Sequence, residues 1–168
     1  MSWPPPLLAI VISESAVVHI VIGQPLLVPG VLYRLWVLRM AIIGKVTGGK
    51  GEGKFFVSLK PYQQGFKEIL GFVPFPGTLN VRLRDADVHK IDRMRNHADG
   101  IIDGFKMDGR DYFAIRLYKA RIRDEEGALI FPHLQHHPLG IAEFVAKNDM
   151  RAKYRLKDDD EVEIEVPE

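Results

Sequence analysis

The sequence predicts a mainly β fold, a small closed or nearly closed barrel of about seven short strands with few helices. Three observations support this prediction. Short runs rich in Val, Ile and Phe recur along the chain, turn signals containing Gly or Pro separate them, and 168 residues suffice for one hydrophobic core but hardly for two. The strand signals begin near residue 40, so the prediction concerns residues 40–168.

Residues 1–39 differ in composition from the rest and form a separate N-terminal extension. They carry few charges, and prolines interrupt their apolar runs, which are shorter than the ~20 residues that span a bilayer. A membrane span is therefore disfavoured, as is a secretory signal, which needs a basic leader. Two interpretations remain: a leader that binds a membrane or a partner, or upstream sequence from a misplaced start. We favour the second, with Met40 as the true first residue.

The first half of the domain is expected to hold three strands and a helix. A glycine cluster separates the first two strands, and Pro74-Phe75-Pro76-Gly77 forms a rigid turn before the third. Apolar spacing predicts the helix, which Gly71 ends. We expect strands at 41–47, 54–59 and 79–83, a helix at 62–70, and a loop with one helical turn at 84–99.

Two hairpins and two further strands are expected in the second half. Asp108-Gly109 between apolar runs is the strongest hairpin signal in the chain. We expect a hairpin of 101–107 with 110–123, a second turning at 125–127 into 128–131, strands at 141–146 and 161–166, and a helical turn at 149–154.

Charge and composition narrow the class of ligand. The chain has 23 basic and 22 acidic residues, whereas proteins that grip nucleic acid usually have a basic excess. Without cysteine, it has no disulfide and no thiolate metal site. We therefore expect a cytoplasmic protein that binds a small molecule, not a nucleic acid or a membrane. The oligomeric state is left open.

The cluster Gly49-Lys50-Gly51-Glu52-Gly53-Lys54 is a candidate phosphate cradle. Alternate glycines let the backbone direct several N–H groups at one anion, and two lysines lie beside them. It is not a Walker A loop, because Phe55 follows Lys54 where Ser or Thr is required. Taken alone, a flexible hairpin loop is the better interpretation of such a cluster.

Thr78 and Asn80 form a second candidate motif at the entrance of a predicted strand. Their two-residue spacing places a hydroxyl and an amide carbonyl on the same face. Both are hard oxygen ligands of the kind that Mg²⁺ takes in phosphoryl-transfer sites. The alternative is a turn whose polar side chains satisfy local backbone groups.

The order of these two motifs resembles that of the archaeal CTP-dependent riboflavin kinases. The resemblance spans about Ile43 to Val166. It is carried by Gly49 to Phe56, Tyr62, Gly71 to Asn80, Pro132, His137, Glu143, Met150-Arg151 and Leu156 to Asp158.

The resemblance implies a six-stranded cradle-loop β-barrel with one or two short helices. It also implies a riboflavin kinase, which transfers the γ-phosphate of CTP to the 5′-hydroxyl of riboflavin and yields FMN and CDP. The residues so implied are Gly49, Lys50, Gly51, Glu52, Gly53, Lys54, Asn148, Asp149, Met150 and Arg151 for the nucleotide, Thr78 and Asn80 for Mg²⁺, and Glu143 for the flavin.

Three positions depart from the family pattern. Gln135 stands where the family has a threonine that contacts the flavin, Lys147 replaces a proline and Asp159 replaces a glycine. Gln135 can still hydrogen-bond and is retained as a flavin-binding candidate. Glu143 is the acidic residue implied near the acceptor, so we expect it either to orient or deprotonate the riboflavin hydroxyl or to contact the flavin alone.

His133, His136 and His137 raise the alternative of a transition-metal site. Adjacent histidines diverge on a strand, and neither Cys nor Asp joins them, so surface or substrate-lining histidines are the better interpretation. Two function classes rival the kinase: a barrel that binds a nucleotide or flavin as a sensor without catalysis, and a barrel that serves only as an interaction module.

Overall fold

The computed structural model describes residues 39–49, 51–94, 98–132 and 140–167. They form nine strands and four short helices. The elements are β1 (Arg39–Thr47), α1 (Glu52–Ser58), α2 (Lys60–Leu70), β2 (Leu79–Leu83), α3 (Asp85–Met94), β3 (Gly100–Ile102), β4 (Phe105–Met107), β5 (Arg110–Tyr112), β6 (Ile115–Ile122), β7 (Glu125–Pro132), β8 (Ile141–Ala146), α4 (Met150–Tyr154) and β9 (Glu161–Pro167). None of the helices among these residues is long and apolar enough to cross a membrane.

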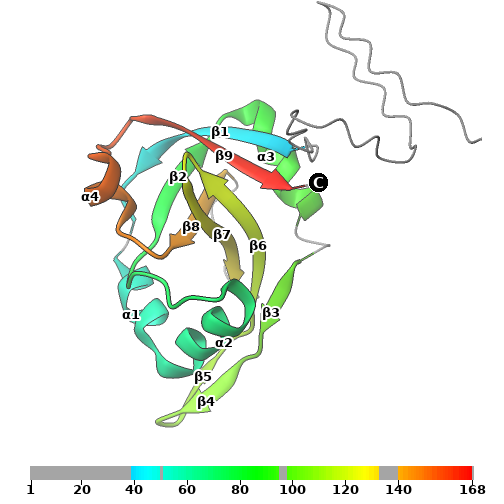
Figure 1. Ribbon diagram of the computed structural model, residues 1–168. Coiled ribbons are helices and arrows are strands. Elements are labelled where there is room, and N and C mark those ends of the chain that lie inside the picture. The colour runs from blue at the N-terminus through cyan, green and yellow to red at the C-terminus, as the bar shows by residue number, and fades with distance from the viewer. Residues whose placement is uncertain (1–38, 50, 95–97, 133–139, 168) are drawn as a thin grey trace, which may run out of the picture. The chain divides into compact units, whose positions relative to one another are not determined.

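Six strands close into an antiparallel barrel. Their order is β6-β7-β8-β2-β1-β9, and β9 returns to β6 through the pair Arg121 and Glu165. Figure 1 shows this ring, with β3 added beside β6 and the β4–β5 hairpin below it. The predicted mainly β class and six-stranded barrel are thereby confirmed.

Side chains fill the inside of the barrel. Alternate residues of all six strands join one buried cluster, as Leu79, Val81 and Leu83 of β2 illustrate. Because successive side chains of a strand point to opposite faces, Asn80 between them points outward. The interior is therefore filled, and Asn80 belongs to the outer wall of the barrel.

A second apolar cluster covers part of that outer wall. It joins outward-facing residues of β6, β7 and β8, such as Leu117, Ile130 and Val145, to Val57 of α1 and Phe66 of α2. Helices α1 and α2 therefore pack on the outside of the barrel (Figure 1).

Several predicted elements are confirmed. Strands β2 and β8 occupy the predicted residues, α2 ends at Gly71, and α4 lies within the predicted helical turn. Asp108 and Gly109 both have positive φ, 51° and 74°, as a tight two-residue hairpin turn requires.

The predicted strand at 54–59 is wrong, because these residues form α1 and the bend that follows it. Their Phe and Val content favours a strand locally, but Val57 is buried in the second cluster and Phe56 packs against it. Packing on α2 and the barrel wall thus overrides the local preference.

The loop predicted at 84–99 is also wrong over most of its length, because α3 spans Asp85–Met94. Two acidic residues in its first turn favour the helix N-terminus. Val88, Ile91 and Met94 recur every three residues and pack on the barrel core along one helix face.

The hairpins differ from the prediction in detail. The run 101–107 is divided between β3, which pairs with β6, and β4, which pairs with β5. The second hairpin turns two residues earlier than predicted, because Ile122 pairs with Glu125 and leaves Arg123 and Asp124 as its turn.

Candidate functional site

A cavity of about 900 Å³ lies against the outer wall of the barrel. Its walls come from the glycine loop, α1, β2, β8 and the β4–β5 hairpin with the residues just after it. The glycine loop is the cluster from Gly49 to Lys54, whose last three residues begin α1. A volume of this size accommodates a ligand of the size of a nucleotide or larger. The polar residues that line it include Thr47, Glu52, Lys54, Thr78, Asn80, Arg110, Glu143 and Arg151.

Three polar residues form a row across neighbouring strands on this wall. Asn80 of β2 pairs with Thr47 of β1 on one side and with Glu143 of β8 on the other. All three line the cavity. The barrel register therefore joins residues that are distant in sequence into one polar strip.

The glycine loop lies directly on this strip. A Cβ at position 49 would lie 1.9 Å from Nδ2 of Asn80, and a Cβ at position 53 would lie 2.7 Å from Oγ1 of Thr78. Any larger residue at either position would displace the loop or the polar side chain. The two sequence motifs thus meet in the structure, and glycine permits the close approach.

Thr78 and Asn80 present two oxygen atoms toward each other. The Thr78 hydroxyl donates to Oδ1 of Asn80 at 3.3 Å. The loop that leads to them is held to β8, because the N–H of Phe75 donates to the carbonyl oxygen of Ala146 at 2.8 Å. A rigid loop therefore presents this oxygen pair at the entrance of β2.

Glu143 is a half-buried carboxylate in the same strip. Burial, with a further contribution from the charge of Glu52, raises the pKa of Glu143 to about 7. The carboxyl group is therefore divided between its protonated and ionised forms near neutral pH. Two acidic side chains near the Thr78 and Asn80 oxygens favour a cation or a proton donor in this part of the cavity.

Arg151 lines the cavity from α4, where its guanidinium is already held by the protein. Its Nη2 donates to the carbonyl oxygen of Thr47 at 2.9 Å and to the Asp158 carboxylate at 2.7 Å. The side chain thus ties α4 to the start of the glycine loop.

The other predicted residues near α4 have structural partners. Asn148 donates to the buried carboxylate of Glu125, and Asp149 caps α4 by accepting from the N–H groups of Arg151 and Ala152. Met150 is buried in the barrel core. Of the four residues predicted here, Arg151 is the one that lines the described part of the cavity.

Lys50, Gln135 and the three histidines at 133, 136 and 137 lie outside the described residues. Their predicted roles therefore stay predictions. Within the ranges that the structure describes, no group of three or more His, Cys, Asp or Glu residues is placed to hold a metal ion.

Sequence reasoning missed an aromatic part of the cavity wall. Phe55 and Phe56 of α1 and Tyr112 and Phe113 of the hairpin segment line it. The rings of Phe56 and Tyr112 lie 6.4 Å apart at a steep angle, and Phe55 and Phe113 are exposed. The aromatic residues at 105, 112 and 113 were a signal, but their position depends on how the hairpin packs.

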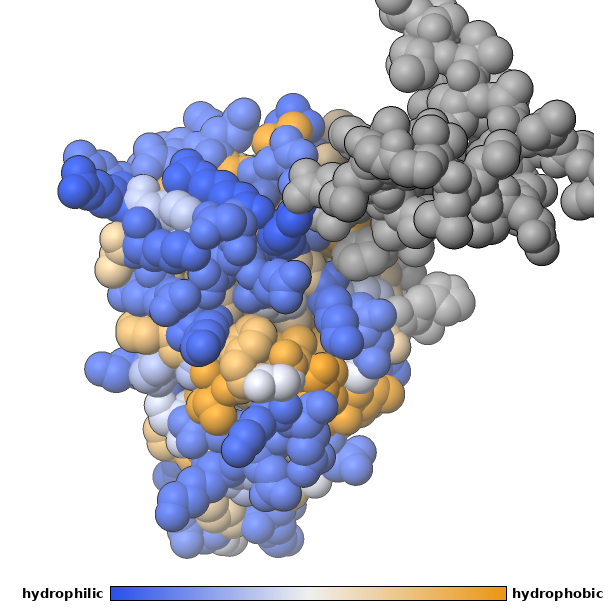
Figure 2. Space-filling view, in the orientation of Figure 1, coloured by the Kyte–Doolittle hydropathy of each residue, from blue (hydrophilic) through white to orange (hydrophobic). Residues whose placement is uncertain are grey.

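A separate apolar surface lies outside this cavity. Figure 2 shows apolar side chains gathered over α2 on an otherwise hydrophilic face. Val73 and Phe75, in the loop between α2 and β2, are exposed.

The fold and the site together define a class: a small closed barrel whose glycine loop and paired oxygens form one cavity on the outer wall. A family model described as "Domain of unknown function DUF120", and labelled for CTP-dependent riboflavin kinase, matches residues 46–166. The chain belongs to this family.

Curated relatives carry the name riboflavin kinase. The protein from Pyrobaculum calidifontis is 38% identical over 134 residues, which cover 77% of this chain and 61% of that protein. The one from Archaeoglobus fulgidus is 39% identical over 125 residues, covering 74% and 54%. The one from Ignicoccus hospitalis is 39% identical over 127 residues, covering 76% and 71%. The chain thus spans about three-fifths of the length of such relatives.

Proposed function

We propose that this protein is a riboflavin kinase that transfers the γ-phosphate of CTP to the 5′-hydroxyl of riboflavin, yielding FMN and CDP. One observation carries the proposal: in a chain of this family, Gly49 and Gly53 lie against Asn80 and Thr78 in a single cavity. A phosphate cradle and an oxygen pair for a cation in one place are the parts that phosphoryl transfer requires.

The glycine loop is the proposed site of the nucleotide phosphates. Gly49, Gly51, Glu52, Gly53 and Lys54 all line the cavity. Backbone N–H groups in such a loop can converge on one phosphate group, and the Lys54 ammonium adds a positive charge. Cytidine as the base rests on the family name and on the resemblance of the motifs.

The residues at the entrance of β2 fit Mg²⁺ as the metal. Thr78 and Asn80 offer one hydroxyl and one amide oxygen, and Glu52 and Glu143 lie near enough for their charges to interact. Mg²⁺ prefers hard oxygens and usually takes few of them from the protein in phosphoryl-transfer sites. When bound there, the cation supplies charge neutralisation for the triphosphate.

The remaining residues of the cavity fit the acceptor. A riboflavin ring is planar and largely apolar, and the wall of Phe55, Phe56 and Tyr112 offers it aromatic surface. Glu143 in its ionised form can accept the proton of the attacking hydroxyl, and in its protonated form it can donate to a flavin oxygen or nitrogen. Its pKa of about 7 makes both forms available at neutral pH.

Catalysis would then come mainly from positioning. The attacking hydroxyl, the γ-phosphate and the leaving diphosphate must lie nearly in line, and the walls of the cavity hold both substrates for this. One proton leaves the riboflavin hydroxyl, the γ-phosphorus bonds to its oxygen, and the bond to the CDP oxygen breaks.

The full chain incubated with riboflavin, CTP and Mg²⁺ tests the proposal, with FMN measured by chromatography. We expect FMN and CDP in equal amounts, and a lower rate when ATP replaces CTP. FMN formation with ATP but not with CTP would reject CTP as the phosphate donor. Binding of CDP and riboflavin without any FMN would instead identify a non-catalytic sensor.

A further inference from the structure

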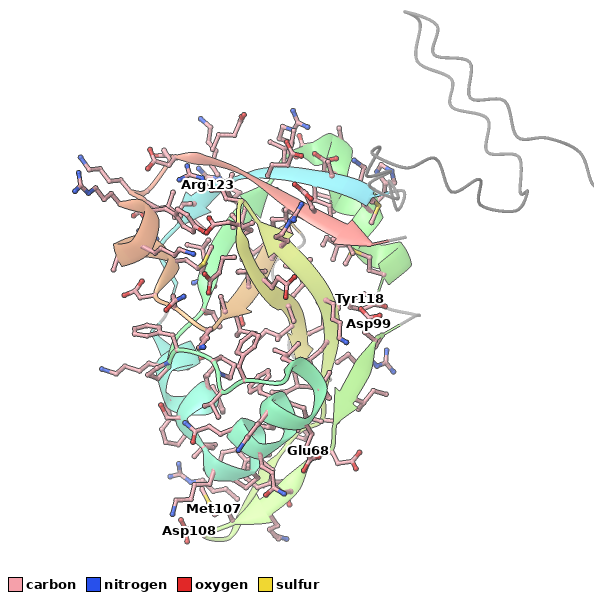
Figure 3. All side chains as sticks on the ribbon, viewed as in Figure 1. Glu68, Asp99, Met107, Asp108, Tyr118 and Arg123 are labelled. Atoms are coloured by element: carbon pink, nitrogen blue, oxygen red, sulfur yellow. The ribbon has the colours of Figure 1, made fainter. Side chains whose placement is uncertain are left out.

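The β4–β5 hairpin lies outside the barrel and contributes to the cavity. It forms a two-stranded sheet of its own. Figure 3 labels Met107 and Asp108 at its far end, away from the barrel. Because no described strand of the barrel pairs with it, side-chain contacts hold the hairpin against the rest of the protein.

Aromatic rings attach one face of the hairpin to the helices. The ring of Phe105 lies 4.8 Å from that of Tyr62 in α2 and stacks on Tyr112 at 4.8 Å. The Tyr62 hydroxyl donates to the carbonyl oxygen of Phe113 at 2.6 Å. The face that carries Phe105 and Tyr112 is therefore the face turned toward α1, α2 and the cavity.

Arg110 belongs to that inward face. It is two residues from Tyr112 on the same short strand, and side chains two residues apart point to the same side. Lys106 and Asp111 pair across the hairpin and form an ion pair at 3.6 Å, and Lys106 does not line the cavity, although Asp111 also belongs to its lining. Arg110 lines the cavity, is exposed, and has no hydrogen bond or ion pair with any residue that the structure describes.

Among the charged side chains that line the cavity, Arg110 differs from Arg151 in having no partner among the described residues. Arg151 already binds the Asp158 carboxylate and the Thr47 carbonyl oxygen. The acidic residues of the lining are Glu52, Asp111 and Glu143. Among the cations of the lining, Lys54 and Arg110 therefore have side chains with no hydrogen bond or ion pair to another described residue. A phosphate-bearing ligand that enters this cavity needs cations that are not already neutralised.

We propose that Arg110 binds a phosphate group of the ligand, so that the hairpin supplies a guanidinium to the cavity in addition to the groups from β2. The planar guanidinium matches two phosphate oxygens at once, which gives both charge and orientation. This inference rests on the proposed function for the identity of the ligands. Two phosphates qualify, that of the donor nucleotide and that of the product FMN.

The test measures binding of CDP, FMN and riboflavin, each separately, to the full chain with Mg²⁺ present. The variants are Arg110→Ala and Arg110→Lys, and Lys106→Ala is the matched control, since it removes a cation of the same hairpin that does not line the cavity. We expect Arg110→Ala to weaken a phosphate-bearing ligand about tenfold or more and riboflavin less than twofold. Arg110→Lys should recover part of the loss, and Lys106→Ala should bind as the wild type does.

If Arg110→Ala weakens the binding of CDP alone, Arg110 binds the donor phosphate. If it weakens the binding of FMN alone, Arg110 binds the product phosphate. Unchanged affinity for both overturns the inference, as does an equal loss for riboflavin, which has no phosphate. If Arg110→Ala fails to fold, judged by its melting temperature, the comparison of Arg110→Lys with Lys106→Ala decides in the same way. Failure of the proposed function is distinguishable, because it would appear as wild-type protein that binds CDP and forms no FMN.

Discussion

Asn80 and Glu143 lie directly opposite each other on the antiparallel strands β2 and β8, with their side chains on the outer wall of the barrel. This pair joins a proposed metal ligand to a carboxylate that remains partly protonated at neutral pH. Because the strands are hydrogen-bonded on both sides, the barrel itself holds the two groups in place. The chemistry proposed for the cavity depends on this arrangement.

Thr78→Ala tests the proposed Mg²⁺ site. Loss of the hydroxyl removes one of the two facing oxygens, so we expect kcat to fall about 100-fold and the Mg²⁺ concentration for half-maximal rate to rise. The thermal midpoint should change little, because Thr78 is only partly buried. The control is Ser58→Ala, which removes a hydroxyl that bonds Lys54 within α1. An unchanged rate in Thr78→Ala would reject the metal assignment.

Gly49→Ala tests the contact between the glycine loop and Asn80. The new Cβ would lie 1.9 Å from Nδ2 of Asn80, so the loop or the amide must move. We expect a rate loss of about 100-fold, the size that an ångström of misplacement can cause. At Gly48 a Cβ finds its nearest atom 3.9 Å away, so Gly48→Ala should keep its activity. Equal activities of the two variants would contradict the proposed arrangement.

Local patterns predicted those parts of the fold that local chemistry decides. The prolines and glycine at 74–77 set the turn before β2, and alternation of apolar residues set β2 and β8 themselves. The segment 54–59 shows the limit of such patterns. Its Phe and Val residues suit a strand, and only their packing against α2 and the barrel makes them a helix.

The cavity was predictable from the sequence only in part. Motif resemblance identified Thr78, Asn80, Glu143 and the described residues of the glycine loop, all of which line the cavity. The pairing of Asn80 with Glu143 follows from strand register, which no local pattern specifies. Arg110 and Tyr112 were not predicted, because their place in the cavity depends on how a separate hairpin packs on two helices.

Glu143→Gln should change how stability depends on pH. The folded protein raises the pKa of this carboxyl from 4.5 to about 7, so it binds the proton more tightly than the unfolded chain does. The free energy of unfolding of the wild type should therefore fall as pH rises from about 4.5 to 7, by at most about 1.4 kcal/mol per pH unit from this group. Chemical unfolding without ligands measures this, and Glu143→Gln should show a smaller fall.

The control for this pH experiment is Glu126→Gln, an exposed carboxylate of β7. Its stability should follow the pH dependence of the wild type. A Glu143→Gln variant with the same slope as wild type between pH 5 and 7 would show that the carboxyl does not hold its proton in the folded state.

Asp87→Ala should destabilise the barrel although it lies outside the cavity. The buried Asp87 carboxylate accepts from Lys90 at 2.6 Å, from Arg84 at 3.0 Å and from the N–H of Ile43 in β1 at 3.2 Å. Burial alone would raise its pKa, but these hydrogen bonds outweigh burial and lower the pKa below its usual value. Removing the carboxylate leaves the Lys90 ammonium and the β1 donor without it, so we expect the free energy of unfolding to drop by about 3 kcal/mol at pH 7. The lowered pKa also means that the wild type loses this stabilisation as pH falls below 4, so the stabilities of wild type and Asp87→Ala should converge in acid. The control is Asp85→Ala, which changes an exposed residue of the same helix and should keep a stability near that of the wild type at pH 7.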